Sequence, residues 1–403
     1  MSTVVVFNIS AHGHINPTLP LVAELVRRGE RIIYYAGETF RKKIEQTGAV
    51  FRCYSHSAGN DPGGNFGGPF GLMAHMIETT EKMLPQLHEE LCAERPDYLI
   101  LDSMCIWGNL LQQMLGCPAV TSCTTFALND AILKSMRRSS GPRPPISAIL
   151  FGIPMLMRYF RIARRIDRRY GTRSPGLVDF FCNRQALNLV FTSRDVQPYA
   201  ELFDESYKFV GPSIAARHEE IDFPFDQLGS DPVVYISMGT IFNNVADFYR
   251  SCFAAFAGWP SSVVMSIGSN VDEAALGDPP ANVIMRRYVP QLEVLERAAL
   301  FVSHGGMNSV SEALLYGVPL IVVPQIGDQY IVANRVQELG AGLSLQAAQV
   351  TPERLKALAE RVLSNPEFAR RAQALGETLR AAGGYMRAAD EIIAFKGRAG
   401  LSA

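Results

Sequence analysis

The sequence contains no apolar run long enough to cross a lipid bilayer. Its longest strongly apolar stretch, residues 148–157, is about half of the roughly 20 residues that a transmembrane helix requires. No basic region precedes the apolar residues 4–7, and polar Asn8 follows them directly, which predicts a buried strand rather than a signal peptide. An excess of positive charge is also missing, since 38 Lys and Arg balance 39 Asp and Glu. This balance argues against a nucleic-acid partner, and no stable membrane insertion is expected.

Cysteine pairs and several familiar catalytic motifs are absent as well. The seven cysteines form no Cys-x-x-Cys pair, a usage typical of reduced thiols in a cytoplasmic protein, so a structural zinc site is not expected. The chain lacks the G-x-x-x-x-G-K-[ST] motif of P-loop enzymes and the G-x-S-x-G motif of esterases. No G-x-G-x-x-G follows the first predicted strand, which disfavours nicotinamide binding.

The chain instead shows a regular alternation of apolar runs and amphipathic stretches, the pattern of βα units in a mostly parallel sheet. With 403 residues, 48% of them hydrophobic and 19% charged, two globular α/β domains are expected. The predicted domains cover residues 1–212 and 231–403, joined by a linker at 213–230, and the last helix could pack back on the first domain. Strands are predicted at 3–9, 31–36, 97–102, 118–122 and 188–192, and then at 232–237, 262–267, 299–303 and 319–323.

The strongest functional motif lies in the second half. The predicted strand LFVS (300–303) leads into HGGMNS (304–309) and then a helix. Glycines in such a turn let a backbone approach a ligand closely, and the unpaired N–H groups of a helix start bind anions. Taken alone, the segment could be an ordinary βα turn. The glycine-bearing strand end SMGT (237–240) and the segment PQIGDQ (324–329) favour an anion site, since parallel strands end at one ligand-binding edge.

Residues 288–329 carry the motifs YVPQ, HGGMNS and DQ in this order, and HGHINP stands at 12–17. These motifs resemble those of the UDP-glycosyltransferase family, within it most closely the bacterial macrolide glycosyltransferases, and the resemblance extends over essentially the whole chain. It implies a GT-B fold, in which two Rossmann-like domains with mostly parallel sheets face each other across a cleft. It also implies a nucleotide-sugar donor, with neither a divalent metal nor a further cofactor.

The resemblance also assigns roles in the donor site. It assigns Gln291 to the uracil or ribose, and Glu312 to the ribose. Asp328 and Gln329 are assigned to the sugar. Three residues are assigned to the diphosphate, namely His304, Asn308 and Ser309. The whole predicted donor site comprises Ser237, Gly239, Thr240, Val289, Gln291, His304, Gly306, Asn308, Ser309, Glu312, Asp328 and Gln329. Many plant members begin the signature with Trp where this chain has Tyr288, so stacking on the base is not implied there.

Two histidines follow the first predicted strand, in a loop that is predicted to end where Pro17 opens the first helix. A neutral imidazole can take the proton of an alcohol near neutral pH, but a histidine beside a helix start can equally be a capping or packing residue. The family's base is the histidine of its Gly-His-x-x-Pro element, which matches His14 and not His12. The resemblance places the partner aspartate at Asp102, where it would orient the imidazole, although a helix-capping role is open as well.

Two stretches interrupt the α/β pattern. Residues 59–71 hold six glycines and are predicted to form a mobile loop. Residues 139–183, with several prolines, are predicted to be irregular. Their basic segment at 158–169 is interpreted as a solvated helix face, with peripheral membrane contact as the alternative. Adaptable apolar side chains in this half are predicted to surround a hydrophobic acceptor, with a place in the core as the alternative for most of them. These are Met73, Met76, Met83, Phe126, Ile149, Phe151, Met155 and Met157.

These assignments predict an inverting glycosyltransferase that moves a hexose, preferably glucose, from a UDP-sugar to a hydroxyl of a small hydrophobic acceptor such as a macrolide, flavonoid or phenol. In a single displacement, His14 oriented by Asp102 would remove the acceptor proton, and the diphosphate would leave toward His304. Three alternatives stay open. They are a dTDP-deoxysugar donor, a nucleotide-sugar 2-epimerase of GT-B fold, and a nucleotide-sugar-binding protein without catalysis.

Overall fold

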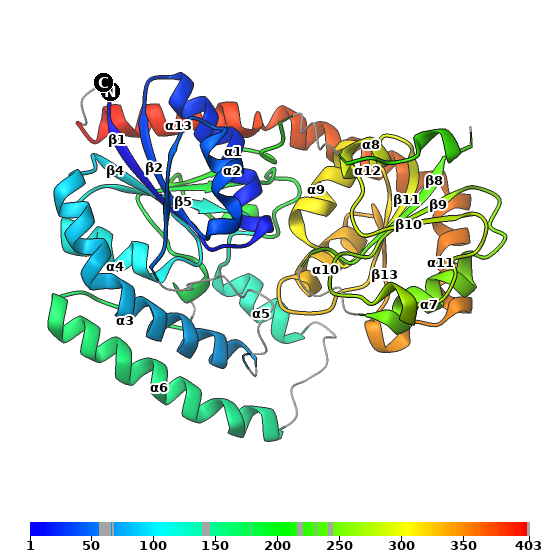
Figure 1. Cartoon of the computed structure of the whole chain (residues 1–403), viewed down its shortest axis with the longest axis horizontal. Helices are drawn as coiled ribbons and strands as arrows, with labels where there is room; N and C mark the ends of the chain where they lie inside the picture. Colours follow the sequence, from blue (N-terminus) through cyan, green and yellow to red (C-terminus); the bar gives the residue numbers. More distant parts are fainter. Residues whose placement is uncertain are drawn as a thin grey trace.

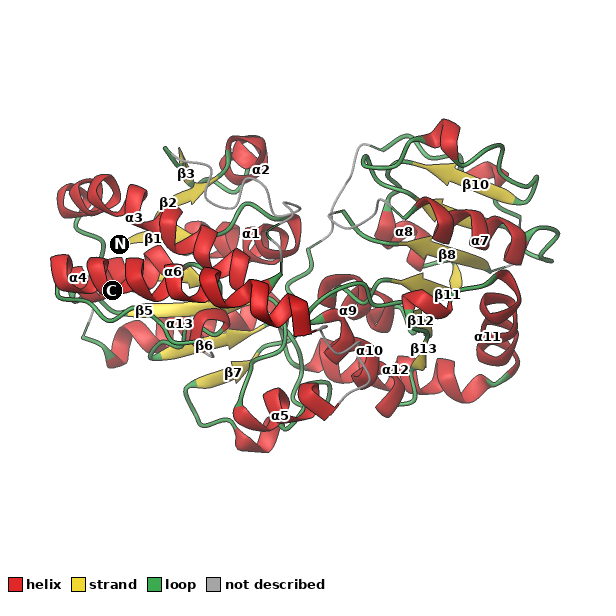
Figure 2. Cartoon of the chain, turned by 90° about the horizontal axis from the view of Figure 1, so that it is seen from below, coloured by secondary structure: helices red, strands yellow, loops and turns green. Residues whose placement is uncertain are grey.

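Two parallel β-sheets flanked by helices make up the computed structural model of the chain (Figures 1 and 2). The structure describes residues 1–55, 66, 68–138, 146–177, 179–215, 221–229, 232–240 and 245–400, without the side chains of residues 135–138 and 146–151. Most of the loop predicted at residues 59–71 therefore lies outside the described residues, and its last three residues belong to a helix.

The first sheet has seven parallel strands in the order β3-β2-β1-β4-β5-β6-β7. Its strands are β1 (Thr3–Phe7), β2 (Arg31–Ala36), β3 (Val50–Cys53), β4 (Tyr98–Asp102), β5 (Ala119–Cys123), β6 (Leu187–Val190) and β7 (Tyr207–Phe209). The helices of this half are α1 (His12–Arg27), α2 (Arg41–Glu45), α3 (Pro69–Glu94), α4 (Ile106–Leu115), α5 (Asp130–Arg138) and α6 (Ile146–Tyr170).

The second sheet has six parallel strands in the order β10-β9-β8-β11-β12-β13. Its strands are β8 (Val233–Ser237), β9 (Val263–Ser266), β10 (Val283–Arg286), β11 (Ala298–Ser303), β12 (Leu320–Val322) and β13 (Gly342–Ser344). The helices are α7 (Ala246–Phe256), α8 (Gln291–Leu295), α9 (Met307–Leu315), α10 (Gln329–Glu338), α11 (Pro352–Ser364), α12 (Pro366–Ala381) and α13 (Gly384–Arg398). The prediction of two Rossmann-like α/β domains is confirmed.

Helices cover both faces of each sheet, which explains why the central strands are continuous apolar runs. In β1, Val4 and Val6 pack in a cluster with α1 and α13, whereas Val5 and Phe7 pack on the opposite face with α3, α4 and α6. The second sheet is built in the same way, with α7 and α11 on one face and α9, α10 and α12 on the other.

Four strands were not predicted from the sequence, and all four form the edges of the two sheets. They are β3, β7, β10 and β13. Each has only three or four residues, and each carries residues that are partly open to solvent. A short strand that is partly exposed to solvent lacks the long apolar run by which the central strands were predicted.

The first helix begins earlier than predicted. It starts at His12, so both N-terminal histidines lie in its first turn rather than in a loop, and Pro17 and Pro20 lie inside it. A proline inside a helix removes one i→i−4 hydrogen bond, whereas a proline in the first turn removes none. The sequence therefore predicted that the helix begins at Pro17. The apolar face formed by Ile15, Leu21 and other residues packs on the sheet and keeps the segment helical.

The prediction that residues 139–183 are irregular is wrong for most of the described part, because residues 146–170 form α6. The hydrogen bond lost at Pro154 is outweighed by an apolar face, which includes Tyr159, Ile162 and Ile166 and packs along α3 (Figure 1). The arginines of the basic segment are exposed along α6. Two of its arginines, Arg158 and Arg165, pair with glutamates of α3.

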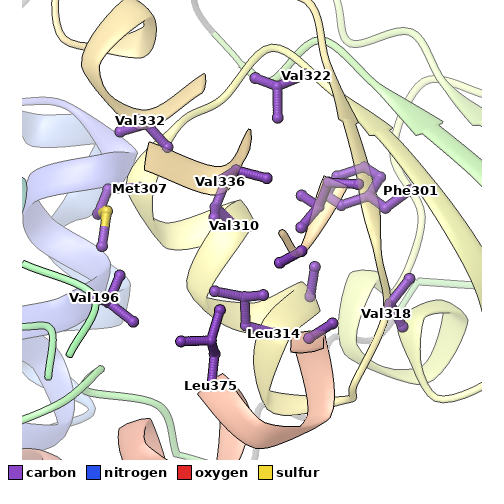
Figure 3. Close-up of a cluster of buried hydrophobic side chains, with 14 of the residues drawn as sticks. Val196, Phe301, Met307, Val310, Leu314, Val318, Val322, Val332, Val336 and Leu375 are labelled. Atoms are coloured by element: carbon purple, nitrogen blue, oxygen red, sulfur yellow. The ribbon is translucent and has the colours of Figure 1, made fainter. Parts of the chain in front are cut away.

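The two halves are in direct contact along α9, α10 and α12. Val196, from the first half, lies beside Met307 and Leu375 in an apolar cluster that continues into the second sheet (Figure 3). Arg335 of α10 fixes the same segment, because its guanidinium donates to the carbonyl oxygens of Val196 at 2.9 Å and Asp195 at 2.8 Å. This interface sets how the carboxyl edges of the two sheets face each other.

The chain crosses between the halves at two adjacent points. The Gly384 N–H, at the start of α13, donates to the Val210 carbonyl at 2.5 Å, just where the first half ends. Beyond this point α13 packs on α1 and β6, and a buried Lys396–Glu30 ion pair joins it to the first half. The described part of the chain therefore both begins and ends at the first sheet (Figure 1). Residues 216–220 and 230 of the linker proposed at 213–230 lie outside the described residues.

Gly376 tests how closely α12 packs against the helix α9. A Cβ at this position would collide with the backbone carbonyl oxygen of Leu314, whereas a Cβ at Gly397 in α13 would meet no atom within 4 Å. We expect Gly376→Ala to destabilise the fold by about 1–3 kcal/mol and Gly397→Ala to stabilise it by up to about 1 kcal/mol. Thermal unfolding of both variants checks this, and equal midpoints would contradict the packing described.

Candidate active site

The predicted functional residues gather where the strand order of each sheet reverses. In the first sheet this point lies between β1 and β4, whose following helices cover opposite faces. His14 follows β1 and Asp102 ends β4. In the second sheet β8 and β11 occupy the corresponding places, with Ser237 ending β8 and His304 following β11. Ligands of doubly wound sheets bind in the crevice at such switch points, beyond the carboxyl ends of the strands.

His14 and Asp102 are brought into direct contact. The His14 Nδ1 lies 2.7 Å from Asp102 Oδ2, and the Oγ1 of Thr124, which follows β5, lies 3.2 Å from the same nitrogen. The Asp102 side chain is fully buried, while that of His14 is 16% exposed. Because a carboxylate only accepts hydrogen bonds, the proton of the neutral imidazole is on Nδ1, and Nε2 keeps its lone pair for a ligand.

The charge of Asp102 governs the titration of His14. Burial disfavours the imidazolium and lowers the pKa, but the negative charge and hydrogen bond of Asp102, with a smaller contribution from the charge of Asp328, outweigh burial. The pKa of His14 is therefore raised above its ordinary value. Asp328 belongs to the second half of the chain, so its charge reaches His14 across the domain interface.

Asp102 is itself held by the turn that follows β4. Its Oδ1 accepts the backbone N–H of Met104 at 2.8 Å, and its own carbonyl accepts from Nδ2 of Asn183 at 3.0 Å. Asn183 adopts a left-handed backbone conformation with φ of 38°. The turn-capping contact and the contact with His14 therefore coexist, one on each carboxylate oxygen. His12 differs, since its ring packs edge-on against Phe40 with the centroids 4.8 Å apart.

The second sheet ends in two matching turns at its switch point. Ser237 and Ser303 face each other in the register of β8 and β11. The Ser237 Oγ accepts the N–H of Gly239 at 3.3 Å, and the Ser303 Oγ accepts the N–H of Gly305 at 3.2 Å. Both glycines have positive φ, 78° and 89°, which a residue with a Cβ adopts only under strain.

The His304 ring lies between two glycines. A Cβ at Gly239 would come 2.6 Å from the ring Cε1, and a Cβ at Gly306 would come 2.5 Å from Nε2, so only glycine leaves room for the imidazole at both positions. Burial lowers the pKa of His304 to about 4, against a smaller opposing effect of a hydrogen bond with the Ser237 backbone. His304 is therefore neutral at physiological pH, and one of its ring nitrogens carries a proton for donation.

Helix α9 begins directly behind this ring. Its N-cap residue, Gly306, has no side chain to accept hydrogen bonds from the N–H groups of the first turn. Asn308 and Ser309 both lie in this turn. The Nδ2 of Asn308 donates to the carbonyl oxygen of Gly13 in α1 at 2.9 Å. One residue of the predicted diphosphate site thus touches the helix turn that carries His14.

A series of side-chain hydrogen bonds connects Glu312 of α9 to Gln291 of α8 and Tyr235 of β8. The Gln291 Nε2 donates to Oε2 of buried Glu312 at 2.5 Å, and the Tyr235 hydroxyl donates to the Gln291 Oε1 at 2.9 Å. The predicted uridine contacts Gln291 and Glu312 are therefore adjacent. Val289 is buried in the core, so only its backbone can reach a ligand, and Tyr288 is 48% exposed.

The two predicted sugar contacts lie at the start of α10. The Gln329 Oε1 accepts the backbone N–H groups of Gln325 at 2.8 Å and Ile326 at 3.2 Å, so its N–H₂ group is the part that can serve a ligand. Asp328 is exposed. The pKa of its carboxyl is raised above its ordinary value, because desolvation by the surrounding protein outweighs the opposite effect of His14. Thr240 is exposed and lies farther out in the β8 turn.

The residues predicted to surround the acceptor are mostly in the cores. Met73, Met76, Met83 and Phe126 are buried in apolar clusters, and Met157 is 67% exposed on the outer face of α6. The side chains of residues 149 and 151 lie outside the described residues. Methionine-rich composition is shared by cores and by adaptable pockets, so composition alone could not separate the two.

Three supporting residues were not predicted from the sequence, namely Asn8, Thr124 and Asn183. Buried Asn8 donates through Nδ2 to the His14 carbonyl at 3.1 Å and to the Tyr34 hydroxyl at 2.9 Å. Asn8 and Thr124 each follow a strand at the carboxyl edge, and that position was the signal that could have identified them. Asn183 lies outside the strands and helices and gave no such signal.

The part of the chain that the structure describes contains neither a membrane-spanning helix nor a cluster of metal ligands. None of its helices combines the length and apolarity that crossing a membrane requires. Within the same residues, no three His, Cys, Asp or Glu side chains are grouped as ligands for a metal ion.

Proteins named as glycosyltransferases resemble this chain in sequence over almost its whole length. A UDP-glucosyltransferase of Bacillus subtilis (strain 168), YojK, itself uncharacterized, is 37% identical over 398 residues, which cover 98% of this chain and 97% of the relative. The chain belongs to the UDP-glycosyltransferase family. The oleandomycin glycosyltransferase of Streptomyces antibioticus is 32% identical over 402 residues, 96% of this chain and 90% of that protein. Residues 253–393 match the family described as erythromycin biosynthesis protein CIII-like, C-terminal domain.

A solved structure confirms the fold. The crystal structure of the glycosyltransferase of kitacinnamycin superposes with a TM-score of 0.84 at 31% identity, covering 97% of this chain and 98% of that one. The chain is thus a GT-B glycosyltransferase of the natural-product type, as its sequence motifs indicated.

The His14–Asp102 pair predicts a measurable change in titration. In Asp102→Asn the negative charge is lost while burial remains, so the pKa of His14 should fall below its wild-type value. NMR titration of the His14 imidazole C–H signals in wild type and in Asp102→Asn measures the difference. An unchanged His14 curve would contradict the pairing.

The same pair makes stability depend on pH. Because the pKa of His14 is raised by folding, its contribution to stability is complete below the unfolded pKa of about 6.5. The contribution is lost as the pH rises through the folded pKa. Urea unfolding of wild type across this range should show the loss, and Asp102→Asn should lack it.

Proposed function

We propose that this enzyme is an inverting glycosyltransferase that moves a hexose from a UDP-sugar to a hydroxyl group of a small hydrophobic acceptor. The observation that carries the proposal is the His14 Nδ1–Asp102 Oδ2 contact of 2.7 Å, on an imidazole that the charge of Asp328 also reaches. This arrangement supports a base on one domain and a sugar-binding carboxylate on the other, within one site.

The reaction we propose is a single displacement. His14 takes the acceptor hydroxyl proton on Nε2 while Asp102 holds the Nδ1 proton and stabilises the imidazolium that forms. The acceptor oxygen forms a bond to the anomeric carbon as the bond from that carbon to the diphosphate oxygen breaks, and the nucleoside diphosphate leaves with the electron pair. An α-linked donor then gives a β-glycoside.

The leaving diphosphate is stabilised by this chain's own donors. The uncapped N–H groups of α9 and the neutral imidazole of His304 supply hydrogen bonds to its oxygens. Ser309, in the same turn, and the turns at Gly239 and Thr240 can add further donors. We propose no resident metal or cofactor, in line with the family.

For the donor we favour UDP-glucose. The adjacent Gln291 and Glu312 suit a nucleoside, and Asp328 with the Gln329 N–H₂ suits a sugar that keeps its hydroxyl groups. The printed name of the YojK relative, a UDP-glucosyltransferase, supports the same choice. A dTDP-deoxysugar is the alternative donor.

For the acceptor we favour a bulky natural product, because the oleandomycin and kitacinnamycin relatives carry such molecules in their names. None of the seven cysteines, all of them in the described part of the chain, forms a disulfide, which supports the cytoplasm as the compartment. An epimerase would need no base on the first domain. The His14–Asp102 pair and the relatives that are named as glycosyltransferases give that alternative no support.

The direct test is mass spectrometry of purified enzyme with UDP-glucose and a panel of macrolides, flavonoids and phenols. Wild type should add a hexose to at least one acceptor. His14→Ala should lower the rate by about 10²–10⁴-fold, the usual contribution of a general base, and still bind UDP. His12→Ala, two residues away in the same helix turn, should retain activity. No adduct despite UDP binding would favour a binding protein or an epimerase.

Gly306→Ala tests the His304 position in the diphosphate site. The backbone of Gly306, at φ −63° and ψ 132°, suits alanine, so the substitution acts only through its Cβ on the imidazole. We expect UDP to bind about 10–100-fold more weakly, the effect of losing a hydrogen bond to a charged group, as measured by calorimetry. Gly229→Ala, where a Cβ meets no atom within 4 Å, is the matched control. Equal affinity for UDP in both variants would argue against a role of His304.

A further inference from the structure

One hydrogen bond joins the first turns of the two helices that carry the catalytic and donor-binding residues. The Asn308 Nδ2, in α9, donates to the Gly13 carbonyl oxygen, in α1, at 2.9 Å across 295 residues of sequence. Gly13 directly precedes His14, and a Cβ on Gly13 would lie 3.9 Å from the same amide nitrogen. The donor-binding helix therefore touches the base-carrying helix one residue away from the base.

Pro17 explains why this carbonyl can accept the bond. In an α-helix the carbonyl of residue i accepts from the N–H of residue i+4, which for Gly13 is residue 17. Proline has no N–H, so α1 cannot satisfy the Gly13 carbonyl in this way. The amide of Asn308 takes the place of the missing helix donor.

The neighbouring carbonyl is held from the other side. The His14 carbonyl accepts from the Nδ2 of Asn8, at the end of β1, at 3.1 Å. Two consecutive carbonyls of this turn are thus bound by side-chain amides, one from each domain. The backbone that carries the His14 side chain is fixed jointly by the first sheet and by α9.

We propose that Asn308 is a positioning residue that links occupation of the donor site to the placement of His14. A side-chain amide has two N–H donors. One binds the Gly13 carbonyl, and the other is directed to the donor diphosphate, so the bound donor, Asn308 and the first turn of α1 become one unit. The inference rests on the proposed donor site. It adds that binding of the donor there also fixes the backbone that carries His14. Pro17 is part of the device, because it keeps the Gly13 carbonyl open.

Pro17→Ala tests the link without altering any donor contact. Alanine restores a helix N–H that competes for the Gly13 carbonyl, while alanine itself favours the helix. We expect kcat to fall about 3- to 10-fold, as for one weakened hydrogen bond, with the donor KM and the UDP Kd within about twofold of wild type. Pro20→Ala makes the same exchange one turn later in α1 and should keep wild-type kcat.

A double-mutant cycle identifies the partner. In an Asn308→Ala background, Pro17→Ala should have no further effect on kcat, because the bond that it weakens is already gone. The proposal is overturned if Pro17→Ala matches wild type, or if its effect is undiminished in the Asn308→Ala background. The second result would assign Asn308 to the diphosphate alone.

Hydrogen exchange provides a measurement that does not depend on catalysis. Saturating UDP should slow exchange of the backbone amides of residues 8–18 in wild type and in Pro20→Ala, and not in Asn308→Ala. Unchanged protection in Asn308→Ala would overturn the link. Protection by UDP in an enzyme that transfers no sugar would contradict the proposed function and leave the link standing.

Discussion

The site depends on one geometric constraint, the opposition of two parallel sheets at their carboxyl edges. All strands of each sheet run in one direction, so every loop after a strand opens at the same edge. The contact between Val196 and Met307, together with the Arg335 hydrogen bonds, holds the two edges against each other. The charges of His14 and Asp328 can then interact although the two residues lie 314 positions apart in the chain. The residues that we propose as base and as donor contacts, which belong to different domains, are thereby brought to one site.

The central strands were predictable, whereas the edges were not, for a physical reason. Strands such as β1 and β4 are buried on both faces and therefore stand out as apolar runs. The edge strands exist because a neighbouring strand offers hydrogen-bond partners, which local sequence does not encode. The start of α1 and the presence of α6 were also predicted wrongly, because tertiary packing overrides the local effect of proline. In α1 and α6 the packing of an apolar face outweighs the hydrogen bonds lost at Pro17 and Pro154.

Within the site, the sequence indicated the residues that we propose to contact ligands, but not the residues that hold them in place. His14 and His304 lie next to recognisable glycine motifs, so motif and sheet topology together indicated them. Asn8 and Thr124 each follow a strand at the carboxyl edge, but a lone Asn or Thr there does not reveal which group it binds, here the carbonyl and the Nδ1 of His14. The contact between Asn308 and the α1 helix depends on the domain arrangement, which no local pattern contains.

The account is tested most directly by the configuration of the product. Proton NMR of the glycoside formed from UDP-α-glucose reports the coupling between the protons on C1 and C2 of the transferred sugar. A single displacement with His14 as base predicts the β-anomer, with the large coupling of two axial protons. An α-glycoside, with the small coupling, would contradict the single displacement and with it the role given to the His14–Asp102 pair.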